Sequence, residues 1–138
     1  MHSIQHIIDM GLNSHTIPDI IVIHLGANDL ATLKSLDIVN KLLGIKSFLL
    51  FKFPAAHVVF SELVYRNVYR NVDQSEFKAV DKARRRVNTL LHKLCSGDVI
   101  PHREITKSMG LGKDGVHLDE VGYHMFVHSI FTSIGKLN

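Results

Sequence analysis

The sequence predicts an α/β domain with a parallel sheet, and three observations favour this fold class. Short, nearly all-apolar runs typical of buried strands occur at residues 19–25, 57–61 and 98–102. Segments with apolar residues at helical spacing flank and separate these runs, at 2–14, 36–51, 75–94 and from 119 onward. Strands that alternate with helices lie parallel and are joined by right-handed crossovers. We therefore expect a single domain over residues 1–138, with about three strands and four helices.

The first strand candidate, residues 20–25, is a run of β-branched and apolar residues that leads into a glycine. Pro18 marks the turn into this strand from the helix at 2–14. The loop at 26–29 should lie at the carboxyl end of the strand, where open α/β sheets bind their ligands. The polar side chains of this loop are therefore candidates for a functional site.

Similar signals predict the next elements. Ser35 is expected to cap the helix at 36–51, and Pro54 prevents this helix from continuing. The strand at 57–61 follows. Residues 62–74 are polar and are expected to form an irregular connection, although they contain the triplet Tyr-Arg-Asn twice, at 65–67 and 69–71.

The helix at 75–94 has the clearest pattern of the four. Its apolar residues fall on one side, namely Phe77, Val80, Val87, Leu90, Leu91 and Leu94. Its other side is basic and carries Lys78, Lys82, Arg84, Arg85, Arg86 and Lys93. After the strand at 98–102, Asp119 is expected to cap a last helix that ends at Gly135.

The composition fits a globular protein in a reducing compartment. Hydrophobic residues make up 46% of the chain, and the single cysteine, Cys95, excludes an internal disulfide. The first residues lack the pattern of a signal peptide, and no apolar run has the length of a bilayer-spanning helix. These features predict a cytoplasmic protein without a membrane partner. The net charge of +3 permits weak contact with polyanions but does not by itself indicate nucleic acid.

The segment Gly26-Ala27-Asn28-Asp29 is the first candidate for chemistry. A glycine after a strand lets the backbone turn sharply and lets a ligand approach closely. The amide of Asn28 can donate a hydrogen bond to a developing oxyanion, which typically stabilises a transition state by about 2.7–4 kcal/mol. Asp29 would support the loop or cap the next helix. The same residues also suit an ordinary strand-to-helix turn.

Asp114-x-x-His117 is the second candidate. A histidine that acts as a general base needs a partner on its other ring nitrogen, which fixes its tautomer and orientation. An aspartate three residues earlier in a loop can provide this partner, although the same segment also suits a turn before a helix. Both motifs fall in loops expected at the carboxyl side of the strands, so Asn28 and His117 could face one crevice.

With both motifs in view, the sequence resembles the SGNH (GDSL-like) hydrolases. The segment at 26–29 is similar to their block III, and Asp114-Gly115-Val116-His117-Leu118 is similar to their block V. Flanking segments resemble the esterase-like domains of vertebrate LINE-type retrotransposons, namely those at 21–26, 60–63, 84–88 and 114–118. The resemblance spans nearly the whole chain but only the later part of the family's domain. It implies a three-layer, flavodoxin-like fold that is incomplete here.

The resemblance also implies carboxylic-ester hydrolysis, with Asn28 as oxyanion donor, His117 as general base and Asp114 as its orienting partner. In the family, block I supplies a serine nucleophile in a Gly-Asp-Ser motif, and block II supplies a second oxyanion donor. No Gly-Asp-Ser occurs in this sequence, and nothing before residue 18 reads as the family's first two strands. We therefore expect an N-terminally truncated domain that lacks the nucleophile, is inactive by itself, and uses no cofactor or metal.

Other polar residues have simpler interpretations. Ser61 ends a strand but aligns with a family position that is not the nucleophile, so a structural role is expected. The histidine pairs at 2 and 6 and at 124 and 128 have metal-binding spacing, but no carboxylate completes a His-Glu-x-x-His frame. A solvated or core-lining role is the simpler reading of both pairs. Cys95 is expected to be a buried apolar residue.

Two functions from different classes stay open at this point. The chain is either part of an esterase that acts on a small acyl ester, or a non-catalytic remnant and binding module. The second reading would use the basic helix at 75–94 for weak nucleic-acid contact, although a solvated helix face explains the same charges. If the family's first strands are absent, residues 20–25 form an exposed sheet edge, which favours self-association.

Overall fold

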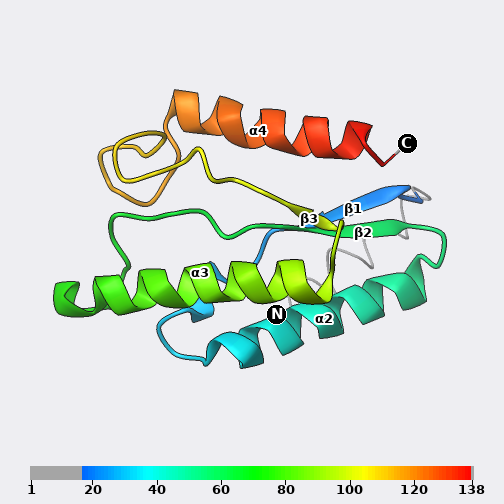
Figure 1. The fold of residues 1–138 in the computed structure, drawn as a ribbon, viewed down its shortest axis with the longest axis horizontal. Coiled ribbons are helices and arrows are strands. Elements are labelled where there is room, and N and C mark those ends of the chain that lie inside the picture. Colours follow the sequence, from blue (N-terminus) through cyan, green and yellow to red (C-terminus); the bar gives the residue numbers. More distant parts are fainter. Residues whose placement is uncertain (1–16, 138) are drawn as a thin grey trace.

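The computed structural model describes residues 17–137, and its centre is a parallel sheet of three strands. These strands are β1 (Ile20–Ile23), β2 (His57–Ser61) and β3 (Val99–Ile100), in the spatial order β1-β2-β3 (Figure 1). The predicted helix at 2–14 lies outside the described residues. The expected α/β class with a parallel sheet is confirmed, and the arrangement is that of an incomplete flavodoxin-like fold.

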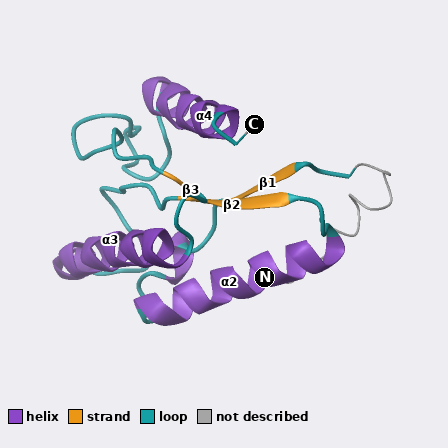
Figure 2. Cartoon of the chain, turned by 45° about the vertical axis from the view of Figure 1, so that its right-hand side comes forward, coloured by secondary structure: helices purple, strands orange, loops and turns teal. Residues whose placement is uncertain are grey.

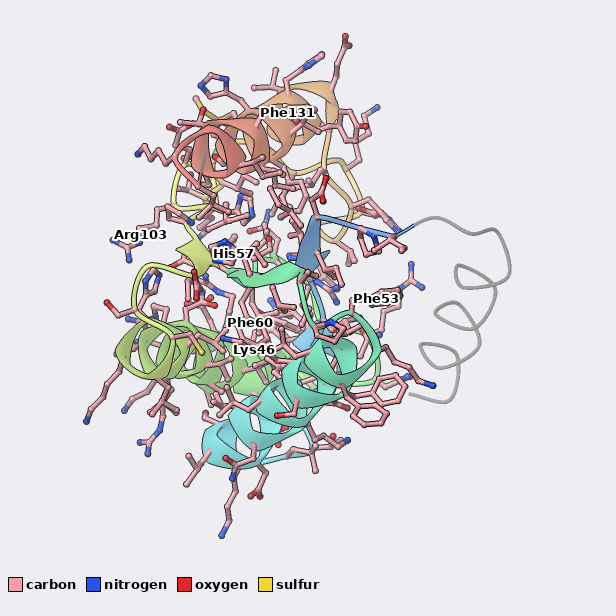
Figure 3. All side chains as sticks on the ribbon, turned by 90° about the vertical axis from the view of Figure 1, so that its right-hand side faces the viewer. Lys46, Phe53, His57, Phe60, Arg103 and Phe131 are labelled. Carbon is pink, nitrogen blue, oxygen red and sulfur yellow. The ribbon has the colours of Figure 1, made fainter. Side chains whose placement is uncertain are left out.

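Helices cover both faces of this sheet and make three layers. Helices α2 (Ser35–Lys52) and α3 (Phe77–Leu94) pack side by side on one face, and α4 (Glu120–Gly135) covers the other (Figures 1 and 2). Phe60 of β2 lies between the sheet and the α2 and α3 layer (Figure 3). None of the helices within residues 17–137 is long and apolar enough to cross a membrane.

Strand β2 is the central strand because β1 and β3 both pair with it. Its residues Val58, Val59 and Phe60 are almost completely buried, as expected for a strand covered on both faces. The outer strands are shorter than predicted. The ladder of β1 ends where Ile23 faces Phe60, and β3 ends before Pro101, which has no backbone N–H to donate.

Strand β1 is an edge of the sheet in the part of the chain that the structure describes, because it pairs only with β2. This agrees with the position expected for residues 20–25 when no earlier strand is present. Edge strands expose backbone donors and acceptors that another strand can use. Self-association through this edge therefore stays a prediction.

The helix starts differ in detail from the sequence prediction. Ser35 is the first residue of α2 rather than its cap. Lys34 occupies the N-cap position and makes no side-chain hydrogen bond there. The predicted helix from residue 75 instead begins at Phe77, after a 3-10 turn at Gln74–Glu76 that Asp73 caps through the Ser75 N–H. The predicted cap Asp119 is confirmed, since its carboxylate accepts the Gly122 N–H at 2.7 Å.

Helix α3 holds the chain that leaves β2. The amide of Asn88, which is buried, donates to the carbonyl of Leu63 and accepts the Leu63 N–H. Arg84 donates to the same carbonyl, so the predicted irregular connection after β2 starts from a fixed point on α3. Leu94, expected on the apolar side, is 52% exposed because the helix ends there, beyond the edge of the core.

Candidate functional site

The structure brings the two sequence motifs to one cavity of about 360 Å³. Asn28 lies in the 3-10 turn Ala27–Asp29 that follows β1, and His117 lies in the loop before α4. Both side chains line this cavity. The parallel sheet explains their proximity, because the carboxyl ends of its strands meet at one edge.

Gly26 sets the direction of the turn that carries Asn28. Its φ of 116° lies in the region that side chains disfavour, and a Cβ there would approach Cγ2 of Ile38 to 3.3 Å. The Gly26 carbonyl accepts the Asp29 N–H at 3.1 Å and closes the turn. Gly26 is therefore required by both backbone conformation and packing against α2.

Asp29 supports this loop mainly through its backbone. Its carbonyl accepts the N–H groups of Thr32 and Leu33 at 3.1 and 2.9 Å. Its carboxylate lies 3.9 Å from the ammonium of Lys41 on α2, at a solvent-exposed position. Such a pair contributes little to stability, so the backbone hydrogen bonds are the main support of the turn.

Asp114 holds the imidazole of His117 from one side. The carboxylate oxygen Oδ2 lies 2.5 Å from Nδ1 of His117, and Oδ1 accepts the N–H groups of Val116 and His117. These hydrogen bonds hold the pKa of Asp114 well below its usual range, and the one from the His117 side chain has the largest effect. Because Nδ1 is occupied, Nε2 is the nitrogen of His117 that remains to exchange a proton with a ligand.

The connection after β2 is tied to the His117 loop. The carbonyl of Gly115 accepts the N–H groups of Asn67 and Val68, at 2.8 and 3.3 Å. A further hydrogen bond joins the Gly112 N–H to the His117 carbonyl at 2.8 Å. The wall of the cavity therefore comes from three segments that are distant in sequence.

Ser61 lies apart from this cavity, in a buried polar cluster that the sequence reasoning missed. Its hydroxyl contacts Nδ1 of His24 at 2.9 Å and Nε2 of His102 at 2.5 Å. The ring of His102 stacks on Phe126 of α4, with ring centroids 4.2 Å apart. Ser61 is 2% exposed and links the sheet to α4, which agrees with a structural role.

A buried carboxylate next to Ser61 joins this cluster to α3. Glu62 is 3% exposed; its carboxylate accepts the backbone N–H of His102 at 3.0 Å and lies 2.7 Å from Nε2 of His92. The sequence signal for the cluster is a polar residue at the carboxyl end of each strand or within two residues of it: His24, Ser61 with Glu62, and His102. Only the sheet order shows that these residues are neighbours.

Burial determines the protonation state of these histidines. Desolvation lowers the pKa of His102 from 6.5 to about 4, with a smaller contribution from His24, while Glu62 acts in the opposite direction. Desolvation also lowers the pKa of His24, although the residue as a whole is exposed. Both shifts favour the neutral imidazole at pH 7, and the ring that accepts the Ser61 O–H must be neutral.

The remaining candidates have ordinary environments. His124 and His128 are exposed on α4, and no group of three or more potential metal ligands occurs within residues 17–137. The pair at residues 2 and 6 lies outside the described residues. Cys95 is buried in the core cluster, which confirms the interpretation of this residue as a small apolar side chain.

No protein-family model matches the sequence, and no curated protein sequence matches it. Among solved structures, the fold matches one described as "a putative platelet activating factor from Streptococcus pneumonia", with a TM-score of 0.67 and 19% sequence identity. The match covers 83% of this chain and 58% of that chain, so this chain spans little more than half of that protein's length. The likeness shows a common fold.

Replacement of Gly26 by alanine should destabilise the protein by about 1–3 kcal/mol, because alanine at φ 116° is strained and its Cβ crowds Ile38. Gly44 within α2 is a matched control, since a Cβ there meets nothing within 4 Å. Gly44→Ala should stabilise the helix by about 0.5–1 kcal/mol. Urea unfolding of both variants measures the difference, and equal effects would contradict the role of Gly26.

Acidification should destabilise the protein between pH 6.5 and about 4. The unfolded chain binds a proton at His102 in this range and the folded chain does not, so stability is complete above 6.5 and falls by about 3 kcal/mol toward pH 4. His102→Gln keeps a hydrogen-bonding side chain and should flatten this slope, whereas His128→Gln should leave it unchanged. Urea unfolding at several pH values checks this, and a slope unaltered by His102→Gln would refute it.

Proposed function

We propose that this chain is the C-terminal part of an SGNH-type carboxylic-ester hydrolase, similar to the esterase-like domains of LINE-type retrotransposons. The observation that carries this proposal is the single cavity lined by Asn28 and by His117, whose Nδ1 is held by Asp114. Each of the two short motifs is common in proteins, but their meeting at the carboxyl ends of parallel strands favours an active site.

The proposed reaction gives each residue one role. Nε2 of His117 takes the proton of a serine hydroxyl as its oxygen attacks the acyl carbonyl, and Asp114 stabilises the imidazolium that forms. The carbonyl oxygen becomes an oxyanion that accepts a hydrogen bond from the side-chain amide of Asn28. His117 then returns the proton to the leaving alcohol. Water repeats the sequence on the acyl-enzyme and releases the acid.

The nucleophile is the component that the described residues do not supply at this cavity. No serine is among the residues that line it within 17–137, and Ser61 is buried in its own hydrogen bonds. A second hollow of about 140 Å³ adjoins Asn28 on the side of β1 and is lined by His24, Leu25 and Gly26. In the proposed enzyme, a strand placed beside the β1 edge carries the Gly-Asp-Ser motif to this side of Asn28.

We expect this chain alone to hydrolyse p-nitrophenyl acetate at a negligible rate, because loss of a serine nucleophile lowers kcat about 10⁶-fold. A longer protein that restores a strand and Gly-Asp-Ser upstream of residue 17 should be active. In that protein, Asn28→Ala should lower kcat about 10²–10³-fold, and His117→Ala should abolish turnover. Turnover by the present chain that His117→Ala abolishes would overturn the expected inactivity. A stop codon directly upstream would favour a non-catalytic remnant.

A second candidate is a nucleic-acid-binding module, and the exposed charges of α3 favour it. Asp81 pairs with Arg84 and Arg85, at 2.8 and 3.3 Å. The other basic residues of α3 form no ion pair within residues 17–137 and are exposed, namely Lys78, Lys82, Arg86 and Lys93. Such a stripe can contact phosphates without reading sequence.

This candidate predicts weak, salt-dependent binding to a fluorescently labelled single-stranded oligonucleotide. Replacement of Lys78, Lys82 and Arg86 by glutamine should weaken binding and reduce its dependence on salt. The same number of charges can be removed elsewhere as a control, by glutamine at Lys34, Lys107 and Lys113, which are all exposed. Equal losses in fluorescence anisotropy titrations of both triple variants would show that only net charge matters, against a site on α3.

A further inference from the structure

The repeated Tyr-Arg-Asn triplets of the connection after β2 have a position that the proposed catalytic roles do not explain. Arg66, Tyr69, Arg70 and Asn71 all line the cavity that contains Asn28 and His117. The backbone hydrogen bonds from Asn67 and Val68 to Gly115 hold this segment against the His117 loop. The repeat therefore forms one wall of the candidate site.

This wall makes the cavity electropositive. Arg66 is half-buried and Arg70 is exposed, and neither forms an ion pair in the part of the chain that the structure describes. Among the described residues that line the cavity, none is acidic. Asp114 is nearby, but its carboxylate is already engaged by His117 and two backbone N–H groups. Two guanidinium groups at this cavity thus lack a counter-charge.

Tyr69 is a buried residue of the same wall. The residue is 5% exposed, and its hydroxyl has no hydrogen-bond partner among residues 17–137. Buried hydroxyl groups in folded proteins nearly always have a partner. The hydroxyl oxygen of Tyr69 is itself buried, so a ligand in the cavity does not reach it in this conformation. The guanidinium groups of Arg66 and Arg70 are the donors that an anionic oxygen would meet.

We propose that Arg66 and Arg70 form an anion subsite beside Asn28 and His117, so that the site takes esters that carry a carboxylate or phosphate group. Arginine pairs such groups through two parallel N–H donors and therefore orients the ligand as well as attracting it. A cavity of about 360 Å³ accommodates a small anionic molecule. The assignment as an ester site rests on the proposed function, whereas the anion subsite does not.

The binding test uses the chain as it is and needs no nucleophile. NMR titrations of the ¹⁵N-labelled chain compare succinate and inorganic phosphate with succinamide, the neutral counterpart of succinate. We expect at least one anion to shift the signals of Asn28 and His117 and succinamide to leave them unchanged; a preference for phosphate or succinate identifies the anionic group. Absence of binding by both anions, or equal binding of succinamide, would overturn the subsite.

Variants locate the anion. Arg66→Gln and Arg70→Gln should each weaken binding about tenfold, and the lysine variants should recover part of it. Arg103→Gln is the control, because Arg103 is 76% exposed, lies at the outside of the molecule, and does not line this cavity (Figure 3). Amide spectra and melting temperatures verify that each variant is folded. An equal loss with Arg103→Gln, or no loss with either cavity variant, would contradict the assignment.

The outcomes for the two proposals can be separated. In the longer protein with a restored nucleophile, Arg66→Gln should lower kcat/KM for an anionic ester about tenfold more than for a neutral ester of the same length. Ester turnover without this discrimination would refute the anionic substrate class and keep the hydrolase. Arginine-dependent anion binding without any ester turnover would refute the hydrolase and keep the subsite.

Discussion

The parallel pairing of β1, β2 and β3 is the constraint on which the rest of the structure depends. Parallel strands all run in the same direction, so their carboxyl ends lie together. Every loop that follows a strand therefore emerges at that end of the sheet. The turn with Asn28, the connection with Arg66 and Arg70, and the loop that leads to His117 are the segments that emerge there. Burial of β2 under helices on both faces holds this arrangement.

Polar residues at this edge divide into two groups with different physical states. His24, Ser61 and His102 are joined by short hydrogen bonds and pack on Phe126 of α4, and desolvation keeps His102 neutral. Asp114 and His117 are exposed, and their pair is controlled by direct hydrogen bonding rather than by burial. The buried Ser61 and His102 hold the fold together, while the exposed carboxylate and imidazole remain available to a ligand.

The exposed edge of β1 and the cavity are connected, because the turn that lines the cavity with Asn28 comes after β1 in the chain. The turn that carries Asn28 follows directly from the strand that pairs only on one side in the described residues. A strand added at that edge would also end beside this turn, since parallel strands end together. The solved structure with the same fold is longer, and this chain matches 58% of it. A strand at this place is part of the proposed hydrolase.

Within residues 17–137, the sequence by itself determined the types of the predicted helices and strands, the central part of each, and the choice of Asn28 and His117 as candidates. These follow from local signals: hydrophobic periodicity, Gly26 after a strand, and a capping aspartate at residue 119. Strand lengths and the start of α3 differed from the prediction because pairing partners and a local 3-10 turn set them. Only the tertiary structure decided that Arg66 and Arg70 share the cavity, that Ser61 is enclosed by two histidines, and that Glu62 is buried beside His92. Each of these contacts joins segments far apart in the chain, and their proximity depends on the order of strands in the sheet, which local periodicity does not encode.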